Sequence, residues 1–329
     1  MYVKIRLLAI IPEDFLTLGV HSIDLPTVTI PALQKGDTVS IVCLARKVSL
    51  EDIQEGIRLL EAWGLRVILG QSIGAEDGYF GGADAVRLTD FQQMLDNPEI
   101  KAIFSARGGY GTTRILDQID FSSLQKNPKW VIGFSDVTAM LCHLHALGLE
   151  SVHGTMPLLM GKPDTQEADD TLYQILFHEP LPYSLPAHPQ NILGSATGQI
   201  IGGNLILLDT ISATASDMDY TGKILFLEDV GEYYYNVDRV LVHLRRQGKL
   251  AKLAGLIVGQ FSDMNDTAVP FGKDVPKIIL EHCGGYGYPI CFDFPVGHVA
   301  RNLALVVGRE ATLRVENTGV SLEYTPTRF

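Results

Sequence analysis

A serine at the junction of an apolar segment and a helical segment is the residue of this 329-residue chain best placed to do chemistry. Residues 130–134 (WVIGF) are apolar, and Ser135 and Asp136 follow them where a helical periodicity begins. A hydroxyl at such a corner would lie beside the free N–H groups of a helix N-terminus, which can stabilise an oxyanion. The motif GFSDV lacks the last glycine of a G-x-S-x-G elbow, so a simple helix N-cap is the competing interpretation of Ser135.

A glycine-rich loop follows another apolar segment, residues 101–105 (KAIFS). Its residues are Arg107, Gly108, Gly109, Tyr110 and Gly111. Such a loop lets the backbone pass close to a ligand and point N–H groups at an anion or a carbonyl oxygen. It lacks the Lys-Ser/Thr ending of a P-loop and the G-x-G-x-x-G spacing, so a nucleotide site is weakly indicated. The alternative is an oxyanion hole shared with Ser135, since both loops would lie at the same edge of a parallel sheet.

A serine nucleophile requires a base and a group that orients the base. The chain has nine histidines, and most fall in expected helices, near the N-terminus or in a proline-rich segment. His298 stands out because it lies in a polar loop beside Gly297, directly after an apolar strand. His153, at the end of a short strand, could also line a cleft.

A carboxylate that could orient a histidine ends the apolar run at residues 223–227 (KILFL). Burying the carboxylate of Glu228 there is costly unless it is hydrogen-bonded or paired, and it could hold His298 in the required tautomer. The alternative is that Glu228, or its neighbours Asp229 and Glu232, caps the helix that follows or pairs with Arg239.

The elements that would position these residues alternate between short apolar runs and helical segments. The runs are residues 38–45, 66–70, 101–105 and 130–134, and the helices residues 49–63, 84–96 and 136–147. This alternation predicts βαβ units and a buried parallel sheet.

The character of the chain changes at residues 161–197, which contain five prolines and many polar residues. After it come strand-like runs at residues 199–208, 223–227, 255–261, 289–294, 311–316 and 320–324, with a helix at residues 236–247. We therefore expect an α/β domain at residues 31–160, a linker at residues 161–197 and a mixed, β-rich domain at residues 198–329. Residues 1–30 are expected to be a disordered extension rather than a signal peptide.

The composition excludes several classes of function. Lysine and arginine total 26 against 38 acidic residues, a net charge of −12, so nucleic acid and anionic membranes would meet mostly repulsive charge. No segment is apolar over the length that a membrane span needs, which predicts a soluble protein. Four scattered cysteines without CxxC spacing predict buried thiols in a reducing compartment.

Several motifs, in order along residues 31–316, resemble the LD-carboxypeptidase family of serine peptidases, which also contains the microcin C immunity peptidases. They are LQKGDTVSIV, ARGGYGTTRIL, GFSDVTAML, IIGGNLILL, LFLEDVGEYYYNVDRVLVHLRRQG, GLIVGQF and FPVGHVARNLALVVG. The resemblance implies a flavodoxin-like N-terminal domain with a parallel sheet, a mixed, β-rich C-terminal domain, and a site at their junction.

The resemblance also assigns roles to residues. It implies Ser135 as nucleophile, His298 as general base and Glu228 as the acidic member of a triad. The implied oxyanion hole consists of the backbone N–H of Asp136 and one from the turn at Gly108 and Gly109. Arg107, Tyr110, Arg301 and Lys47 are candidates for contacts with substrate, although each cation could equally be a surface ion-pair residue. The chain departs from the family where a Pro-Ser pair commonly follows the first strand, because it has Leu44, Ala45, Arg46 and Lys47 there.

The function that the resemblance implies is hydrolysis of a murein tetrapeptide. The bond cut would join the L-centre of a diamino acid to terminal D-alanine, in the cytoplasm during cell-wall recycling. We expect a homodimer that needs no metal or organic cofactor. Two alternatives are an immunity-type peptidase that cleaves a peptidyl-adenylate antibiotic, and a non-catalytic protein that binds a nucleotide or anion at the glycine loop.

Overall fold

The computed structural model of the chain describes residues 28–326. Most of the extension expected at residues 1–30 therefore lies outside the described residues. At the beginning of the described part, the N–H of Val28 donates to the carbonyl of Gly148 at 2.7 Å, and Ile30 is buried.

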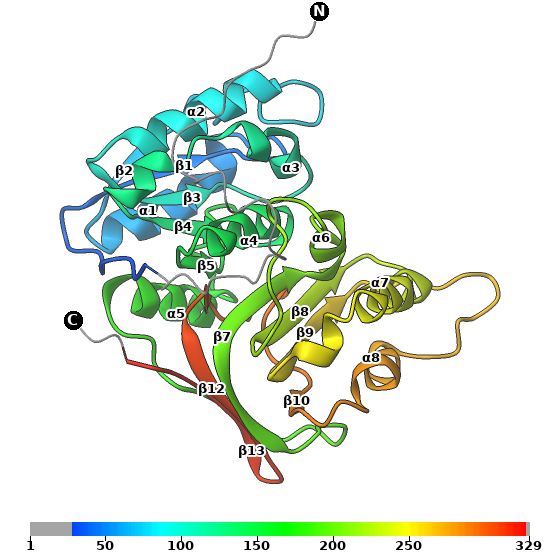
Figure 1. Cartoon of the computed structure of the whole chain (residues 1–329). Coiled ribbons are helices and arrows are strands. Elements are labelled where there is room, and N and C mark those ends of the chain that lie inside the picture. The colour runs from blue at the N-terminus through cyan, green and yellow to red at the C-terminus, as the bar shows by residue number, and fades with distance from the viewer. Residues whose placement is uncertain (1–27, 327–329) are drawn as a thin grey trace, which may run out of the picture.

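Five strands from the first part of the chain and β11 (Leu305–Val307), from near its end, form a six-stranded sheet in the order β11-β5-β4-β3-β1-β2 (Figure 1). Its parallel strands are β1 (Thr38–Val42), β2 (Arg66–Leu69), β3 (Ile100–Ser105), β4 (Trp130–Gly133) and β5 (Ser151–His153). The buried parallel sheet expected from the alternating pattern is confirmed, with one exception at its edge. Ile68 and Leu69 of β2 are exposed, because an edge strand has a neighbour on one side only.

Helices connect these parallel strands. They are α1 (Gln54–Ala62), α2 (Asp84–Asp96), α3 (Thr112–Ile115) and α4 (Thr138–Ala146), with short 3₁₀ helices at Glu51–Ile53, Leu116–Gln118, Ser122–Gln125 and Ser135–Val137. The segment before α1 begins with a reciprocal cap, in which the N–H of Ser49 donates to the Asp52 carboxylate at 2.9 Å and the N–H of Asp52 donates to Ser49 Oγ at 3.2 Å. Gly64, at φ +89°, follows the end of this helix.

The second part of the chain forms a seven-stranded sheet in the order β10-β9-β8-β7-β12-β13-β6. Its strands are β6 (Tyr183–Leu185), β7 (Gly194–Asn204), β8 (Ile224–Val230), β9 (Gly255–Ser262), β10 (Ile290–Cys291), β12 (Glu310–Glu316) and β13 (Gly319–Tyr324). Strands β7 to β10 pair in parallel, whereas β12, β13 and β6 add antiparallel pairs. The mixed, β-rich character expected for this part is confirmed.

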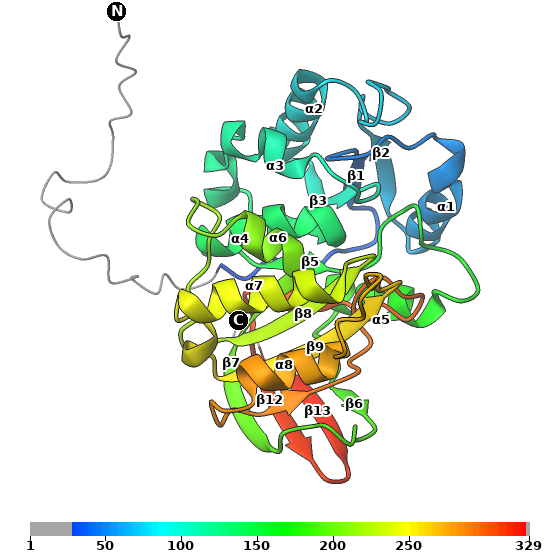
Figure 2. The ribbon, with the colours of Figure 1, turned by 90° about the vertical axis from the view of Figure 1, so that its right-hand side faces the viewer.

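Three helices accompany the second sheet: α6 (Leu205–Thr210), α7 (Tyr234–Arg246) and α8 (Val275–Cys283), with a 3₁₀ helix at Leu250–Lys252. Helices α7 and α8 lie together over strands β8 and β9 (Figure 2). The apolar face of α7 is buried, as its periodicity predicts, through Val237, Val240, Leu241 and Leu244.

The two sheets are tied together by chain segments that cross between them. Residues 161–197 carry helix α5 (Gln166–Phe177) and strand β6, and β6 pairs with β13 of the second sheet. Strand β11 (Leu305–Val307) returns to the first sheet and pairs antiparallel with β5. Next to this pairing, Arg309 Nε lies 2.9 Å from Glu150 Oε1 in a buried ion pair. The segment that follows His298 is thus anchored in the sheet that carries Ser135.

The four cysteines are Cys43, Cys142, Cys283 and Cys291, and all are buried and free. Among residues 28–326, no helix is both long and apolar enough to span a membrane.

Candidate active site

Ser135 lies at a strained corner between β4 and the short helix at Ser135–Val137. Its φ is +62°, in the left-handed region that a residue with a Cβ rarely adopts. Gly133 permits the corner, because a Cβ at that position would lie 2.8 Å from Val137 Cγ1. The hydroxyl is half-buried at the carboxyl end of the sheet, where open α/β folds bind ligands.

His298 and Glu228 complete a chain of two hydrogen bonds that begins at Ser135. His298 Nε2 lies 2.9 Å from Ser135 Oγ, and His298 Nδ1 lies 2.7 Å from Glu228 Oε2. Glu228 is fully buried on β8, and His298 stands in the loop before β11 with its ring against Phe134. A hydroxyl, an imidazole and a carboxylate in this series can generate a nucleophile by general-base catalysis.

The loop that carries His298 is fixed by its neighbours. Gly297 has φ +127°, and a Cβ there would lie 2.8 Å from Glu228 Cβ. Its N–H donates to the buried Asn302 Oδ1 at 2.8 Å. The polarity of this loop in the sequence pointed to His298, whereas the role of Asn302, which accepts the Gly297 N–H and closes the loop, was not predicted.

Two carboxylates give the imidazole a negative environment. Burial, the largest single influence, lowers the pKa of His298, but the hydrogen bond that His298 donates to Glu228 and the charges of Glu228 and Asp229 together outweigh it, so the pKa is raised above 6.5. Burial, followed by repulsion from Glu228, raises the pKa of Asp229 to about 7. The protonated imidazole that forms when His298 accepts a proton is stabilised by this environment.

Asp229 has a structural role that was not predicted from the sequence. Its carboxylate accepts from Asn204 Nδ2 at 2.8 Å and from the N–H of Ile206 at 3.1 Å, so it caps α6. The N–H of Asn204 in turn donates to Thr138 Oγ1, on the helix that follows Ser135, at 3.1 Å. These hydrogen bonds connect β8, which carries Glu228, to α4, the helix that follows Ser135.

The alternatives considered for the acidic residues are thereby decided. Glu228 points to His298 rather than capping the helix after it. Glu232 accepts from Asn236 Nδ2 at 2.9 Å, and Arg239 lies over the ring of Tyr235 at 5.1 Å.

The glycine loop lies directly against the serine. A Cβ at Gly108 would be 3.2 Å from Ser135 Oγ, and Gly109 has φ +122°. The carboxylate of Asp136 accepts from the N–H of Thr112 at 2.8 Å, which ties the two loops together. In the described part of the chain, the N–H groups of Gly108 and Gly109 donate to no protein acceptor. They are available to a substrate oxygen bound at Ser135.

The residues considered for substrate contacts have different surroundings. Arg107 is half-buried, with Nη1 at 3.5 Å from the carbonyl of Lys47, and Tyr110 is exposed beside the ring of Phe80. Lys47 Nζ forms an exposed ion pair with Glu76 at 2.9 Å.

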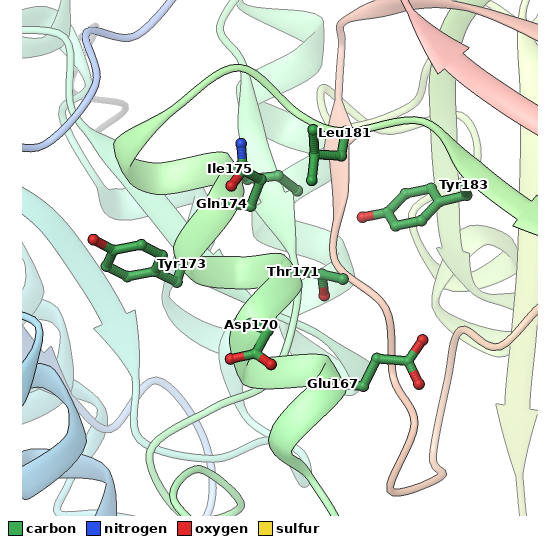
Figure 3. A pocket seen from close by; sticks show the side chains of 8 residues that line it. All are labelled: Glu167, Asp170, Thr171, Tyr173, Gln174, Ile175, Leu181 and Tyr183. Atoms are coloured by element: carbon green, nitrogen blue, oxygen red, sulfur yellow. The ribbon is translucent and has the colours of Figure 1, made fainter.

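Arg301 pairs with Glu167 on α5, with Nε 2.6 Å from Oε2 and Nη2 2.7 Å from Oε1. Glu167 also lines a cavity of about 340 Å³ along α5, between that helix and Tyr183 (Figure 3). None of Ser135, Glu228 and His298 lines this cavity. The ion pair attaches the end of the His298 loop to α5.

His153, the other histidine considered as a base, is fully buried between the rings of Phe134 and Phe226. Burial lowers its pKa to about 4, so it is neutral at physiological pH. It lies behind the site, and the structure shows no hydrogen bond from it to Ser135. Within residues 28–326, no cluster of three or more His, Cys, Asp or Glu side chains is arranged to hold a metal ion.

A serine at a strained strand-to-helix corner, bonded to a histidine that a buried glutamate orients, defines the class of hydrolases that use a serine nucleophile. Residues 39–154 match the LD-carboxypeptidase N-terminal domain, and residues 197–313 match the LD-carboxypeptidase C-terminal domain. The chain belongs to the LD-carboxypeptidase family and is a serine-type carboxypeptidase, as the resemblance of its motifs predicted.

Relatives and solved structures agree with this assignment. The chain is 34% identical to a probable murein peptide carboxypeptidase of Bacillus subtilis (strain 168), over 88% of this chain and 92% of the relative. It is 30% identical to the murein tetrapeptide carboxypeptidase of Pseudomonas aeruginosa, over 84% of this chain and 92% of the relative.

The muramoyltetrapeptide carboxypeptidase of Oxalobacter formigenes superimposes with a TM-score of 0.81 at 26% identity, over 89% of this chain and 100% of that one. The microcin C7 self-immunity protein MccF in complex with aspartyl sulfamoyl adenosine has a TM-score of 0.81 at 23% identity, over 91% of this chain and 99% of that one. MccF therefore shares the fold.

Proposed function

We propose that this protein is a murein tetrapeptide carboxypeptidase that releases terminal D-alanine, with Ser135 as nucleophile, His298 as general base and Glu228 as the acid that orients it. The observation that carries the proposal is the pair of hydrogen bonds in series, 2.9 Å from Ser135 Oγ to His298 Nε2 and 2.7 Å from His298 Nδ1 to Glu228 Oε2. The murein peptide carboxypeptidases among its relatives support the choice of substrate.

The proposed reaction is an acyl transfer in two steps. His298 Nε2 takes the proton of Ser135 while Oγ attacks the scissile carbonyl carbon, and the oxyanion accepts from the N–H of Asp136 and from one in the Gly108 and Gly109 turn. Protonated His298, stabilised by Glu228, then gives the proton to the leaving amine of D-alanine. Water, deprotonated by His298, hydrolyses the acyl-enzyme and restores Ser135.

The site needs both parts of the chain. Ser135 and the glycine loop come from the first sheet, whereas Glu228 and the segment before His298 belong to the second. We propose a division into an α/β domain at residues 31–160 and a β-rich domain at residues 198–329, with residues 161–197 between them. Two strands cross this division, since β11 joins the first sheet and β6 joins the second. On this division neither domain is active alone.

The substrate proposal is tested by incubating the protein with a murein tetrapeptide and with the same peptide ending in L-alanine. D-alanine should appear in proportion to enzyme, and the L-alanine peptide should be cut much more slowly. Equal rates, or no D-alanine, would contradict the proposed specificity. For the biological setting we propose a cytoplasmic homodimer, to be checked by cell fractionation and light scattering.

A second candidate function is supported by the fold shared with MccF, which is known in complex with aspartyl sulfamoyl adenosine. On this alternative, the same serine and histidine would hydrolyse a peptidyl-adenylate antibiotic. A side-by-side assay of both substrates separates the two functions, because the murein proposal requires the higher kcat/KM for the tetrapeptide.

A further inference from the structure

Arg46 packs against the glycine loop at residues 107–111. A Cβ at Gly109 would lie 2.6 Å from Arg46 Cβ and 3.6 Å from its Cδ. A Cβ at the preceding residue, Gly108, would lie 3.2 Å from Ser135 Oγ. The stem of Arg46 is thus one residue of the turn away from the proposed nucleophile.

The backbone fixes Arg46 in this place. Arg46 forms a β-bridge with Phe80, and the N–H of Lys47 donates to the carbonyl of Tyr79 at 3.1 Å. The guanidinium of Arg46 lies over the ring of Tyr79, 5.4 Å from its centroid. The contact with the aromatic face restricts the side chain and leaves its N–H groups free to donate.

Arg46 and Arg107 differ from the other cations near the loop in having no carboxylate partner. Nearby, Arg87 and Arg114 both pair with Asp84, and Lys47 pairs with Glu76. No acidic group in residues 28–326 lies within ion-pair distance of Arg46 or Arg107. Nε of Arg107 is buried and has no hydrogen-bond acceptor in the described structure.

The surroundings of Arg107 are those of a site for an anion. Burial, and next the positive charge of Arg46, lower its pKa, while Asp52 attracts it from beyond ion-pair range. Two like charges held near each other, one of them half-buried, repel unless an anion lies between them. A carboxylate suits such a pair, because a guanidinium can donate to both of its oxygens.

The proposed reaction brings a carboxylate to this place. When a single terminal residue leaves, its carboxylate lies within about one residue length, ~3.8 Å, of the scissile bond. The scissile carbonyl must touch Ser135 Oγ while its oxygen faces the glycine turn. The terminal carboxylate then falls within reach of Arg107, which directly precedes that turn, and of Arg46, which packs against it.

We propose that Arg46 and Arg107 bind the free C-terminal carboxylate of the peptide substrate and so make the enzyme a carboxypeptidase. The proposal rests on the function proposed above, and it concerns the segment where this chain departs from the Pro-Ser pair common in the family. Lys47, which already has an acidic partner, takes no part in it.

Peptide binding tests the pair independently of catalysis. Ser135→Ala protein would be titrated by calorimetry with a murein tetrapeptide ending in D-alanine, and with the same peptide ending in the carboxamide. The free acid should bind about 10- to 100-fold more tightly, as expected for hydrogen bonds to a charged group. Arg46→Gln and Arg107→Gln, each added to Ser135→Ala, should weaken binding of the acid about tenfold and leave binding of the amide unchanged.

Arg314→Gln is the matched control, because it removes one positive charge from the exposed β12–β13 hairpin. It should leave both affinities unchanged. Equal affinity for acid and amide, or no binding of the acid, would overturn the proposal, as would a full preference for the acid in both arginine variants. Hydrolysis by the protein with Ser135 intact is measured separately, so that a failure of the proposed activity is distinguished from a failure of this carboxylate site.

Discussion

Ser135 Oγ and His298 Nε2 are 2.9 Å apart although 163 positions separate the two residues in the chain. Their contact requires the first and second sheets to be held in one fixed relative position. Two contacts fix this relative position: the pairing of β11 with β5, and the hydrogen bond from the N–H of Asn204 to Thr138 Oγ1. The geometry of the proposed triad is therefore a property of the junction between the sheets.

Replacing Glu228 by Gln should lower kcat/KM by roughly 10²–10⁴-fold and change the pH profile. A general base acts when deprotonated, so the raised pKa of His298 places the rise in activity of the wild type above pH 6.5. Without the carboxylate, burial dominates and the pKa of His298 falls, so the rise should move to lower pH. An unchanged midpoint in the kcat/KM profile would contradict the assignment of Glu228.

Gly108→Ala tests the close approach of the glycine loop. The new methyl group would lie 3.0 Å from Ser135 Cβ and 3.2 Å from its Oγ, so it should displace the loop and reduce kcat by about 10²-fold or more. Gly285→Ala is a matched control, because a Cβ there meets nothing within 4 Å. Equal activity of the two variants would argue against an oxyanion site at this turn.

The buried ion pair of Glu150 and Arg309 should stabilise the junction of the sheets. Glu150→Gln leaves the buried guanidinium with only its longer contact to Glu179, whose Oε2 lies 3.6 Å from Nη1, and this should lower the free energy of unfolding by up to about 3–5 kcal/mol. Glu323→Gln disrupts an exposed pair with Arg314 and should cost at most about 1 kcal/mol. Urea denaturation of both variants checks the contrast, and similar losses would refute it.

Asp229→Asn should change how stability depends on pH. Because the pKa of Asp229 is raised from 3.8 to about 7, the folded state holds its proton more tightly than the unfolded chain does. The stabilisation that this bound proton gives the folded state is complete below about pH 4 and is lost as the pH rises to about 7. Relative to the wild type, the variant should therefore gain about 1–4 kcal/mol between pH 4 and 7. If the free energies of unfolding of the wild type and Asp229→Asn differed by the same amount at every pH, the inferred cost of ionising the buried Asp229 carboxyl would be contradicted.

The sequence allowed the elements and the corner at Ser135 to be predicted, because their signals are local. Apolar runs ending in polar residues indicate strand ends, and this placed Glu228 and His298 where chemistry could occur. Contacts between distant segments left no such signal. The cap that Asp229 forms on α6, and the pairing of β11 with β5, depend on how the second sheet docks.

Composition likewise could not distinguish one cation from another. Lys47 and Arg301 were candidates for substrate contacts on charge alone, and only the structure shows that each has an acidic partner. In the sequence, Arg46 was noted only as part of residues 44–47, where the chain lacks the Pro-Ser pair common in the family. Its packing against Gly109 depends on the fold that brings the two loops together.

The most direct test of the proposed mechanism is the rate of D-alanine release by Ser135→Ala and Ser135→Gly, measured beside the wild type. The glycine variant accepts φ +62° without strain, so it should be folded and at least as stable as the alanine variant. Circular dichroism and thermal melting establish that both are folded. We predict a loss of at least about 10³-fold in kcat for both variants. Release of D-alanine at the wild-type rate by either folded variant would contradict the assignment of Ser135 as the nucleophile.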